Sequence, residues 1–412
     1  MVGRLCISFL PLLSWTTAGV FAGSATLCEE GWAGIYPCEE IDLLAVMPTD
    51  VIGGGEGNDL WGWTDPETGS EYALMGRTSG TSFIDISNPT TPIYVGDLPT
   101  QTSDNTWRDI KVFANHAFIV SEATDHGMQV FDLTQLRDVT LPPETFVPTA
   151  HYDGVSGTHN VVINEETGFA YLVGSNTCAG GLQFVDISDP VNPTPAGCYS
   201  ADGNTHDAQC VVYRGPDVRY RDRELCFAAN IDTLTIVDVT DKMNPVPVSR
   251  TEYVGFGLTH QGWLTEDHAY FLLADELDEM SNGHNTRTRI WDLQDLEDPF
   301  VAGRFDGPTK ATDHNLYVRG ERAYLAAYRA GLRILDLRDI ADANLAEIAT
   351  FDVFPNSDSN SWSGAWSVYP YFESGVLIVS SIEDGLFVLR PREIFQDTFV
   401  YGNTDAWSAS VP

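Results

Sequence analysis

A short phrase recurs six times along the chain at intervals of 44 to 54 residues: an apolar strand that ends in Asp and is followed by another apolar residue. The copies end at Asp85, Asp132, Asp186, Asp238, Asp292 and Asp336, and a degenerate seventh has Arg390 instead. Two apolar strands precede each copy, and a turn and one more strand follow it, so each repeat holds four strands. Repeats of about 40–50 residues with several short strands are typical of β-propellers. We therefore predict an all-β, seven-bladed β-propeller.

The ends of the chain indicate how the ring closes. The last repeat has no clear fourth strand after Arg390-Pro391, whereas residues 41–48 resemble the fourth strands of other repeats, such as residues 93–99. We predict that this N-terminal strand completes the seventh blade, because ring closure removes free sheet edges. The alternative closing strand is 398–401.

The repeated Asp, with Ser, Thr, Asn or Asp after it, resembles a cluster of oxygen ligands for a metal ion. Six calcium sites would each need several more oxygen atoms, however. Asp and Ser side chains also bind backbone amides in tight turns. We therefore interpret the repeated Asp residues as turn residues.

The first residues indicate the compartment. Arg4 precedes an apolar stretch over residues 5–15, and small residues follow, as in a secretory signal peptide. We predict a signal peptide over residues 1–22, a propeller over 23–395 and a C-terminal tail over 396–412. No later run is long and apolar enough to span a membrane. The expected localisation is secreted, in the extracellular space.

Cysteine usage agrees with export. Cys6 lies in the predicted signal peptide, which leaves six cysteines in pairs that are near in sequence: Cys28 and Cys38, Cys178 and Cys198, Cys210 and Cys226. Zinc is the competing interpretation, but there is no C-x-x-C motif. Six cysteines allow 15 pairings, so the nearest-neighbour disulfides are a hypothesis.

The chain carries 22 Lys and Arg against 59 Asp and Glu, a formal net charge of −37. Such a surface repels phosphate backbones, which excludes nucleic acid as a partner. It attracts a cationic ligand or a divalent metal.

The phrases at residues 182–186, 234–238 and 332–336 resemble LVIVD repeats. With Asn58-Asp59-Leu60-Trp61-Gly62-Trp63, they make residues 38–395 similar to the choice-of-anchor B family of exported proteins. The resemblance implies a propeller and export, with no settled activity. Members are typically tethered by a C-terminal anchor, and because residues 396–412 show none, we expect release.

Aligning the repeats on their first strands places a histidine at the same position in blades three to six. These residues are His159, His206, His260 and His314. The same alignment gives Asp59 in blade one, Arg108 in blade two and Gly364 in blade seven. Because first strands line the central channel of a propeller, we expect these side chains at one mouth of the channel.

The second strand of a blade runs antiparallel to the first, so its end lies at the same mouth. The ligand-binding residues that we predict there are Arg108, Asp109, Glu122, Asp207, Gln261, Asp275, Glu276 and Arg329. The acidic run Asp275-Glu276, with Asp278 and Glu279, is either a cation site at the rim or a solvated loop.

Three interpretations of the histidines stay open. Neutral imidazole is a common metal ligand, so Asp59, His159, His206, His260 and His314 are candidates to bind a divalent transition metal. Alternatively, the histidines and Arg108 form a cationic patch for a carboxylate or sulfate. In the third interpretation the histidines are a structural ring that joins blades through hydrogen bonds.

The function that we predict is a secreted binding module whose channel mouth recognises an extracellular small molecule, glycan or protein. The alternative is a metal-assisted extracellular hydrolase or lyase at the same mouth, with Arg108, His206 and Tyr328 as candidate catalytic residues.

Overall fold

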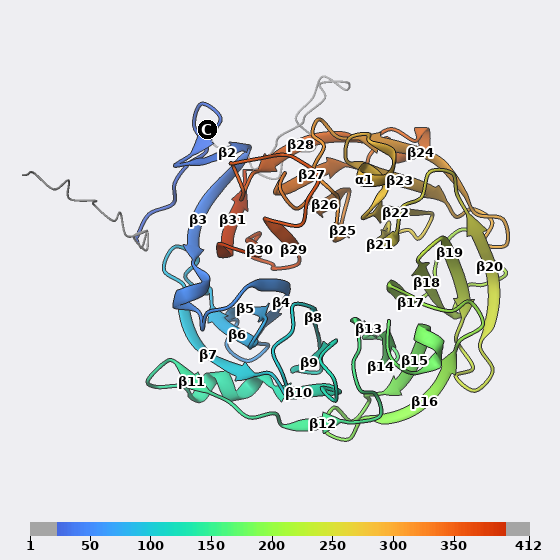
Figure 1. The fold of residues 1–412 in the computed structure, drawn as a ribbon, viewed down its shortest axis with the longest axis horizontal. Coiled ribbons are helices and arrows are strands. Elements are labelled where there is room, and N and C mark those ends of the chain that lie inside the picture. The colour runs from blue at the N-terminus through green and yellow to red at the C-terminus, as the bar shows by residue number, and fades with distance from the viewer. Residues whose placement is uncertain (1–22, 393–412) are drawn as a thin grey trace, which may run out of the picture.

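A computed structural model describes residues 23–392, which form a ring of seven antiparallel sheets around a central channel (Figure 1). The predicted signal peptide (1–22), the predicted tail (396–412) and the alternative closing strand (398–401) lie outside the described residues. The predicted all-β, seven-bladed propeller is confirmed.

Each blade has four strands that follow chain order from the channel outward, except that β3 supplies the outermost strand of blade seven. Blade one contains β4 (Gly57–Thr64), β5 (Glu71–Arg77), β6 (Gly80–Asp85) and β7 (Ile93–Pro99), with β11 (Glu144–Thr145) beside β7. Blade two contains β8 (Arg108–Phe113), β9 (His116–Ser121), β10 (Met128–Asp132) and β12 (Ala150–Tyr152). Blade three contains β13 (Asn160–Asn164), β14 (Phe169–Val173), β15 (Leu182–Asp186) and β16 (Thr194–Tyr199). Blade four contains β17 (Asp207–Val212), β18 (Glu224–Asn230), β19 (Thr233–Asp238) and β20 (Val246–Glu252).

The remaining blades complete the ring. Blade five contains β21 (Thr259–Leu264), β22 (Tyr270–Asp275), β23 (Arg287–Asp292) and β24 (Phe300–Asp306). Blade six contains β25 (Leu316–Arg319), β26 (Arg322–Ala326), β27 (Leu332–Asp336) and β28 (Ala346–Phe351), extended by β2 (Tyr36–Glu39) and β1 (Trp32–Ala33). Blade seven contains β29 (Ala365–Tyr369), β30 (Leu377–Ser381), β31 (Gly385–Pro391) and β3 (Ile41–Met47). One short helix, α1 (Asp278–Asn282), and 3-10 turns at Thr49–Val51, Leu133–Asp138, Cys178–Gly180 and Ile340–Asp342 lie in the connections of the described chain.

The position of a strand in its blade explains its apolar pattern. Middle strands such as β5 and β18 are buried along their whole length, because the neighbouring blades cover both of their faces. Such strands read as continuous apolar runs. The outermost strands β20 and β24 are buried at no position and mix polar with apolar side chains. The repeated phrase is therefore the third strand of a blade, at the centre of the packing.

Ring closure occurs as the sequence predicts. Strand β3 pairs antiparallel with β31, from Ile41 opposite Pro391 to Met47 opposite Leu386. Beside this pair, the Arg392 guanidinium donates to Asp42 at 2.9 Å. The N-terminal strand thus supplies the fourth strand of blade seven.

The repeated Asp residues are turn residues. Asp85 accepts a hydrogen bond from the backbone amide of Ser87 at 2.8 Å, and Asp186 accepts one from Ser188 at 2.9 Å. The remaining copies make the same bond two residues on, at Asp132, Asp238, Asp292 and Asp336. The carboxylate fixes the turn that leads into the fourth strand.

The three predicted disulfides, Cys28–Cys38, Cys178–Cys198 and Cys210–Cys226, are all present. Cys210 and Cys226 lie opposite each other on β17 and β18, so this bridge staples two strands of blade four. In residues 23–392 we find no helix with the length and apolar character that crossing a membrane requires.

Replacing both Cys210 and Cys226 with Ala is expected to lower the free energy of unfolding by about 3 kcal/mol. The bridge closes a loop with a sequence separation of 16, which restricts the unfolded chain. Urea unfolding of the oxidised wild type and the double variant measures the change. A difference below about 0.5 kcal/mol would contradict it, because most disulfide removals from exported domains cost more.

Candidate functional site

The four predicted histidines form an arc at one mouth of the channel. Each lies at or just before the start of the innermost strand of blades three to six, β13, β17, β21 and β25. The ring centroids of His159 and His206 are 4.2 Å apart, those of His206 and His260 are 4.2 Å apart, and those of His260 and His314 are 4.4 Å apart. The repeat therefore places one imidazole per blade, in contact with the next.

Hydrogen bonds orient these imidazoles. The Nδ1–H of His206 donates to the carbonyl oxygen of His260 at 3.1 Å, and the Nδ1–H of His314 donates to that of Trp366 at 2.5 Å. In the neutral ring these bonds leave the lone pair on Nε2, the atom that binds metals. At the end of the arc, His159 Nδ1 donates to Glu122 Oε1 at 2.6 Å.

Glu276 brings a carboxylate to the arc. It follows the last residue of β22, where the strand ends at the channel mouth. Its Oε1 accepts a hydrogen bond from the Tyr328 hydroxyl at 2.9 Å and lies 3.9 Å from His314 Nε2. Three potential ligand atoms, one each from His206, His260 and Glu276, lie within 4.8 Å of one another.

Burial favours the neutral form of three of the four imidazoles. Burial, and then the neighbouring histidines, hold the pKa of His206 and of His260 well below the usual value. Burial also lowers the pKa of His314 to about 3. His260 Nδ1 is buried and has no hydrogen-bond partner. The site therefore offers lone pairs rather than positive charge.

Arg108 and Asp59 do not join the histidines. The Arg108 side chain is buried in blades one and two, where it donates to the carbonyl oxygen of Arg77 at 3.1 Å and to Thr100 Oγ1 at 2.8 Å. It also lies 3.0 Å from His126 Nε2. In blade seven, Trp366 rather than Gly364 occupies the position next to His314, at a centroid distance of 5.0 Å.

In every blade, the residue directly after the position that holds the histidines in blades three to six is polar. These residues are Asp59, Asp109, Asn160, Asp207, Gln261, Asn315 and Ser367. Several of them join neighbouring blades: Asp109 accepts from the Val161 amide at 2.7 Å, and the Gln261 side chain bonds both backbone groups of Leu316 at 2.9 Å. The predicted ligand-binding residues Asp109 and Gln261 are thus occupied in holding blades together.

Lys111 is the cation of this inner ring. Its ammonium group donates to Asp109 Oδ1 at 2.6 Å and to Asp59 Oδ2 at 3.3 Å. Burial acts against its charge, but Asp109 and Asp59 hold the pKa of Lys111 well above its usual value. Burial, and then Asp109, raise the pKa of Asp207 to about 7. Asp59 therefore belongs to an ion-pair network deeper in the channel.

Three other predicted residues have partners. Asp275 is buried and accepts hydrogen bonds from Tyr253 and from the amides of Gly257 and Leu258. Arg329 donates to Ser359 Oγ at 2.5 Å. Burial and Glu276 hold the pKa of Tyr328 well above its usual value, so its phenol stays protonated and donates to Glu276.

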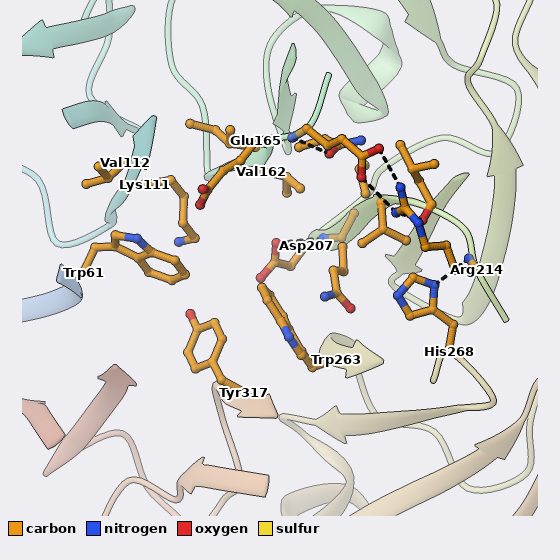
Figure 2. Close-up of a pocket in the computed structure, with 18 residues that line it drawn as sticks. Trp61, Lys111, Val112, Val162, Glu165, Asp207, Arg214, Trp263, His268 and Tyr317 are labelled. Atoms are coloured by element: carbon orange, nitrogen blue, oxygen red, sulfur yellow. Dashed lines mark hydrogen bonds and ion pairs between the residues drawn. The ribbon is translucent and has the colours of Figure 1, made fainter. Parts of the chain in front are cut away.

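A cavity of about 280 Å³ opens at the opposite end of the channel, among the later residues of the inner strands and the turns after them. Figure 2 shows Trp61, Lys111, Asp207, Trp263 and Tyr317 facing a common space. The Lys111 ammonium lies 4.7 Å from the centroid of the Trp61 ring.

The aromatic lining of this cavity and the role of Lys111 were not predicted from the sequence. The alternation of side chains along the first strands could have predicted both, because every second residue of such a strand points toward the channel. Lys111 follows Asp109 by two residues, and Trp61 follows Asp59 by two.

Comparisons with known proteins agree with the repeat analysis. The family model described as LVIVD repeat matches residues 72–100 and 159–201. No curated protein sequence matches the chain. Among solved structures, the β-propeller domain of Cps50 (Swd1) from Myceliophteria thermophila is similar, with a TM-score of 0.51 and 12% identity over 78% of this chain and 93% of that one. At that identity the likeness concerns the fold alone. The chain is therefore a seven-bladed β-propeller that contains LVIVD repeats.

Proposed function

We propose that this protein is a secreted binding module that holds a divalent transition metal at the histidine mouth of its channel. The observation that carries the proposal is the convergence of His206, His260 and Glu276, whose ligand atoms lie within 4.8 Å of one another. His159 and His314 flank this set. Glu276 replaces Asp59 in the ligand set that the sequence suggests.

Two observations favour a metal over an anion. The low pKa values of the buried histidines leave the rings uncharged near neutral pH, so they attract an anion weakly. Arg108, the cation expected in an anion site, is buried elsewhere. A structural ring explains the backbone hydrogen bonds of His206 and His314, but it leaves the buried Nδ1 of His260 without a partner.

Two imidazoles and one carboxylate suit Zn²⁺ or Fe²⁺, and such a set leaves a coordination position open. A donor atom of an extracellular small molecule, glycan or protein would take that position. Trp362 supports ligand contact at this mouth, since it is 56% exposed and its side chain acts on the pKa of Glu276. The disulfides are of the kind that persists in oxidising compartments, which supports secretion.

Recognition accounts for the site better than catalysis. The protonated Tyr328 phenol is a poor general base, and Arg108 does not face the mouth to neutralise a substrate carboxylate. Of the three predicted catalytic residues, His206 and Tyr328 lie at the site, and His206 is the one that offers a lone pair as a base.

Elemental analysis of the purified secreted protein tests the metal site, using wild type, the double variant His206→Ala with His260→Ala, and Glu276→Gln. We expect that both variants lose one equivalent of transition metal that the wild type holds. His116→Ala is the matched control, because His116 lies away from the arc and bonds the carbonyl oxygen of Ala114. Equal metal content in all four proteins would overturn the site.

The open coordination position has its own test. Apoprotein loaded with Co²⁺ is expected to change its visible absorption spectrum when azide is added, because azide takes a free position on the metal. A spectrum that azide does not alter would show a closed site and contradict a role in ligand recognition.

Chelation is expected to lower thermal stability. A metal that binds only the folded state at 100 times its Kd adds about 2.7 kcal/mol to the free energy of unfolding. Differential scanning calorimetry with and without EDTA should show a lower midpoint for the wild type on chelation. The effect should be smaller in the double variant, and an equal effect in both proteins would contradict this prediction.

A further inference from the structure

A second group of side chains lies beside the histidine arc, where the loop after β22 meets the segment before β25. We call Asp278, Glu279, His284 and Asp313 the blade 5–6 cluster. The two segments are joined by backbone bonds, since the Thr286 amide donates to the Thr309 carbonyl oxygen at 3.0 Å and the Gly307 amide to that of Thr286 at 2.8 Å. All three carboxyl groups are buried, although residues 280–283 at the tip of the loop are exposed.

The carboxyl groups of the cluster lack the donors that buried carboxylates need. Neither oxygen of Asp313 has a hydrogen-bond partner, and neither does Glu279 Oε2. Both oxygens of Asp278 also lack a hydrogen bond of good geometry. By contrast, the neighbouring Asp275 accepts from Tyr253 and two backbone amides. Leaving buried charged groups unpaired costs several kcal/mol, which requires a compensating charge.

Positive charge from the protein does not balance the cluster. Arg289 lies with Nη1 at 2.7 Å from Asp278 Oδ2 and at 3.8 Å from Asp275 Oδ2. The Arg289 guanidinium thus pairs with Asp275 and Asp278, whereas Glu279 and Asp313 have no ion-pair partner among the described residues. The negative charges of Glu279 and Asp278 act on Asp313, whose pKa burial and these neighbours raise.

His284 distinguishes a metal from shared protons. Its Nδ1–H donates to the Asn285 carbonyl oxygen at 2.7 Å, which leaves the Nε2 lone pair in the neutral ring. That buried Nε2 has no hydrogen-bond partner and lies 3.5 Å from Asp278 Oδ2. One ligand atom each from Asp278, Glu279 and His284 can be found within 4.8 Å of the others. A metal ion would use this lone pair together with the carboxylate oxygens, whereas protons shared only among the carboxyl groups would leave it without a partner.

We propose that Asp278, Glu279, His284 and Asp313 bind a second divalent transition metal ion, separate from the one at the histidine mouth. Carboxylates with a single imidazole suit Mn²⁺, Fe²⁺ or Zn²⁺, whereas Ca²⁺ takes oxygen ligands. The ion would join the loop after β22 to the segment before β25. Those two segments carry Glu276 and His314, so the second ion stabilises the base of the first site.

Elemental analysis of protein secreted into medium with Mn²⁺, Fe²⁺ and Zn²⁺ tests this proposal. We expect two equivalents of transition metal in the wild type and one in Asp313→Asn. The double variant His206→Ala with His260→Ala should also keep one equivalent, and combining the three substitutions should leave none. Asp298→Asn is the control, because Asp298 is an exposed acidic residue of the same blade.

His284→Gln provides a milder test should Asp313→Asn fail to fold, since the His284 side chain is 18% exposed. Titration of apoprotein with Mn²⁺, followed by the electron paramagnetic resonance of the free ion, should show at least tenfold weaker binding at one site in this variant. Circular dichroism checks that each variant is folded.

The outcomes separate the two sites. If the wild type holds one equivalent of metal and only the His206→Ala with His260→Ala variant loses it, the second site is overturned and the first remains. One equivalent that only Asp313→Asn loses would do the reverse. A wild type that holds calcium alone would show that calcium balances the cluster. A wild type that holds no metal, and that becomes more stable on Asp313→Asn, would show that protons balance it. Either result would overturn the proposal.

Discussion

A chain that begins at residue 49, and so lacks β3, is expected to lose its cooperative unfolding transition and to aggregate. β3 buries four large apolar side chains, those of Ile41, Leu43, Leu44 and Met47. Each contributes roughly 1.5–3 kcal/mol on burial, so the strand supplies roughly 6–12 kcal/mol. Native domains have only about 5–15 kcal/mol in total. Truncation also leaves β31 with an unpaired apolar edge, which promotes association between chains.

The matched control begins at residue 39. It keeps β3 but loses β1, most of β2 and the Cys28–Cys38 bridge, so it should stay folded with a modest loss of stability. Circular dichroism melting and size-exclusion chromatography compare the two proteins. If the shorter chain melts cooperatively at the midpoint of the control, closure by β3 is not what stabilises the ring.

Lys111→Met is expected to lower the free energy of unfolding by about 3–5 kcal/mol at pH 7. The substitution keeps the length of the side chain but removes the cation that faces Asp109 and Asp59 in the channel. The carboxylate of Asp109 then stays buried without its partner. Lys310→Met is the control, because Lys310 is exposed. Urea unfolding measures both, and equal losses in the two variants would contradict the prediction.

The pH dependence of this difference follows from the pKa shifts. Burial alone would raise the pKa of Asp109, but Lys111 and Asp59 lower it, so the ion pair stabilises the folded state above the ordinary aspartate pKa of about 4. The pKa of Lys111 is raised, so its contribution is lost only in strongly alkaline solution. Without Lys111, burial raises the pKa of Asp109 and raises that of Asp207 further, so the unpaired carboxyl groups of the variant take up protons at a higher pH than in the wild type. The difference between wild type and Lys111→Met should therefore be largest in mildly alkaline solution and shrink as the pH falls.

The blade count and the closure were predictable because they depend on local features. In six blades the third strand ends in two apolar residues and an Asp, and the same turn chemistry follows each of them. The fourth strand of blade seven was predictable because the last repeat lacks one and residues 41–48 supply the pattern. The disulfides followed from proximity in sequence, which in a blade means adjacent strands.

The site was only partly predictable. Alignment of the first strands placed the four histidines correctly, because three of them follow a Thr and all four precede a polar residue. In blade one the alignment was one residue off, because Asn58 rather than Asp59 occupies the histidine position. In blade seven it was two residues off, because Trp366 rather than Gly364 occupies that position. Blades one and seven have no histidine at this position to anchor the alignment, whereas blades three to six do. Whether Arg108 and Asp275 were buried depended on contacts between blades, which no local pattern encodes.

The closing pair also determines how the ring responds to mechanical load. Ile41 and Pro391 lie opposite each other at one end of the β3–β31 pair, and the chain leaves the blade on both sides at that end. Tension applied between the two ends of the chain would therefore peel the strands apart one hydrogen bond at a time, instead of shearing all of them together. Before that, the load must break the short β2–β28 pairing and the Arg392–Asp42 contact. A ring anchored through both of its ends would open at blade seven under low force, whereas one held by a single end would carry no load across this seam.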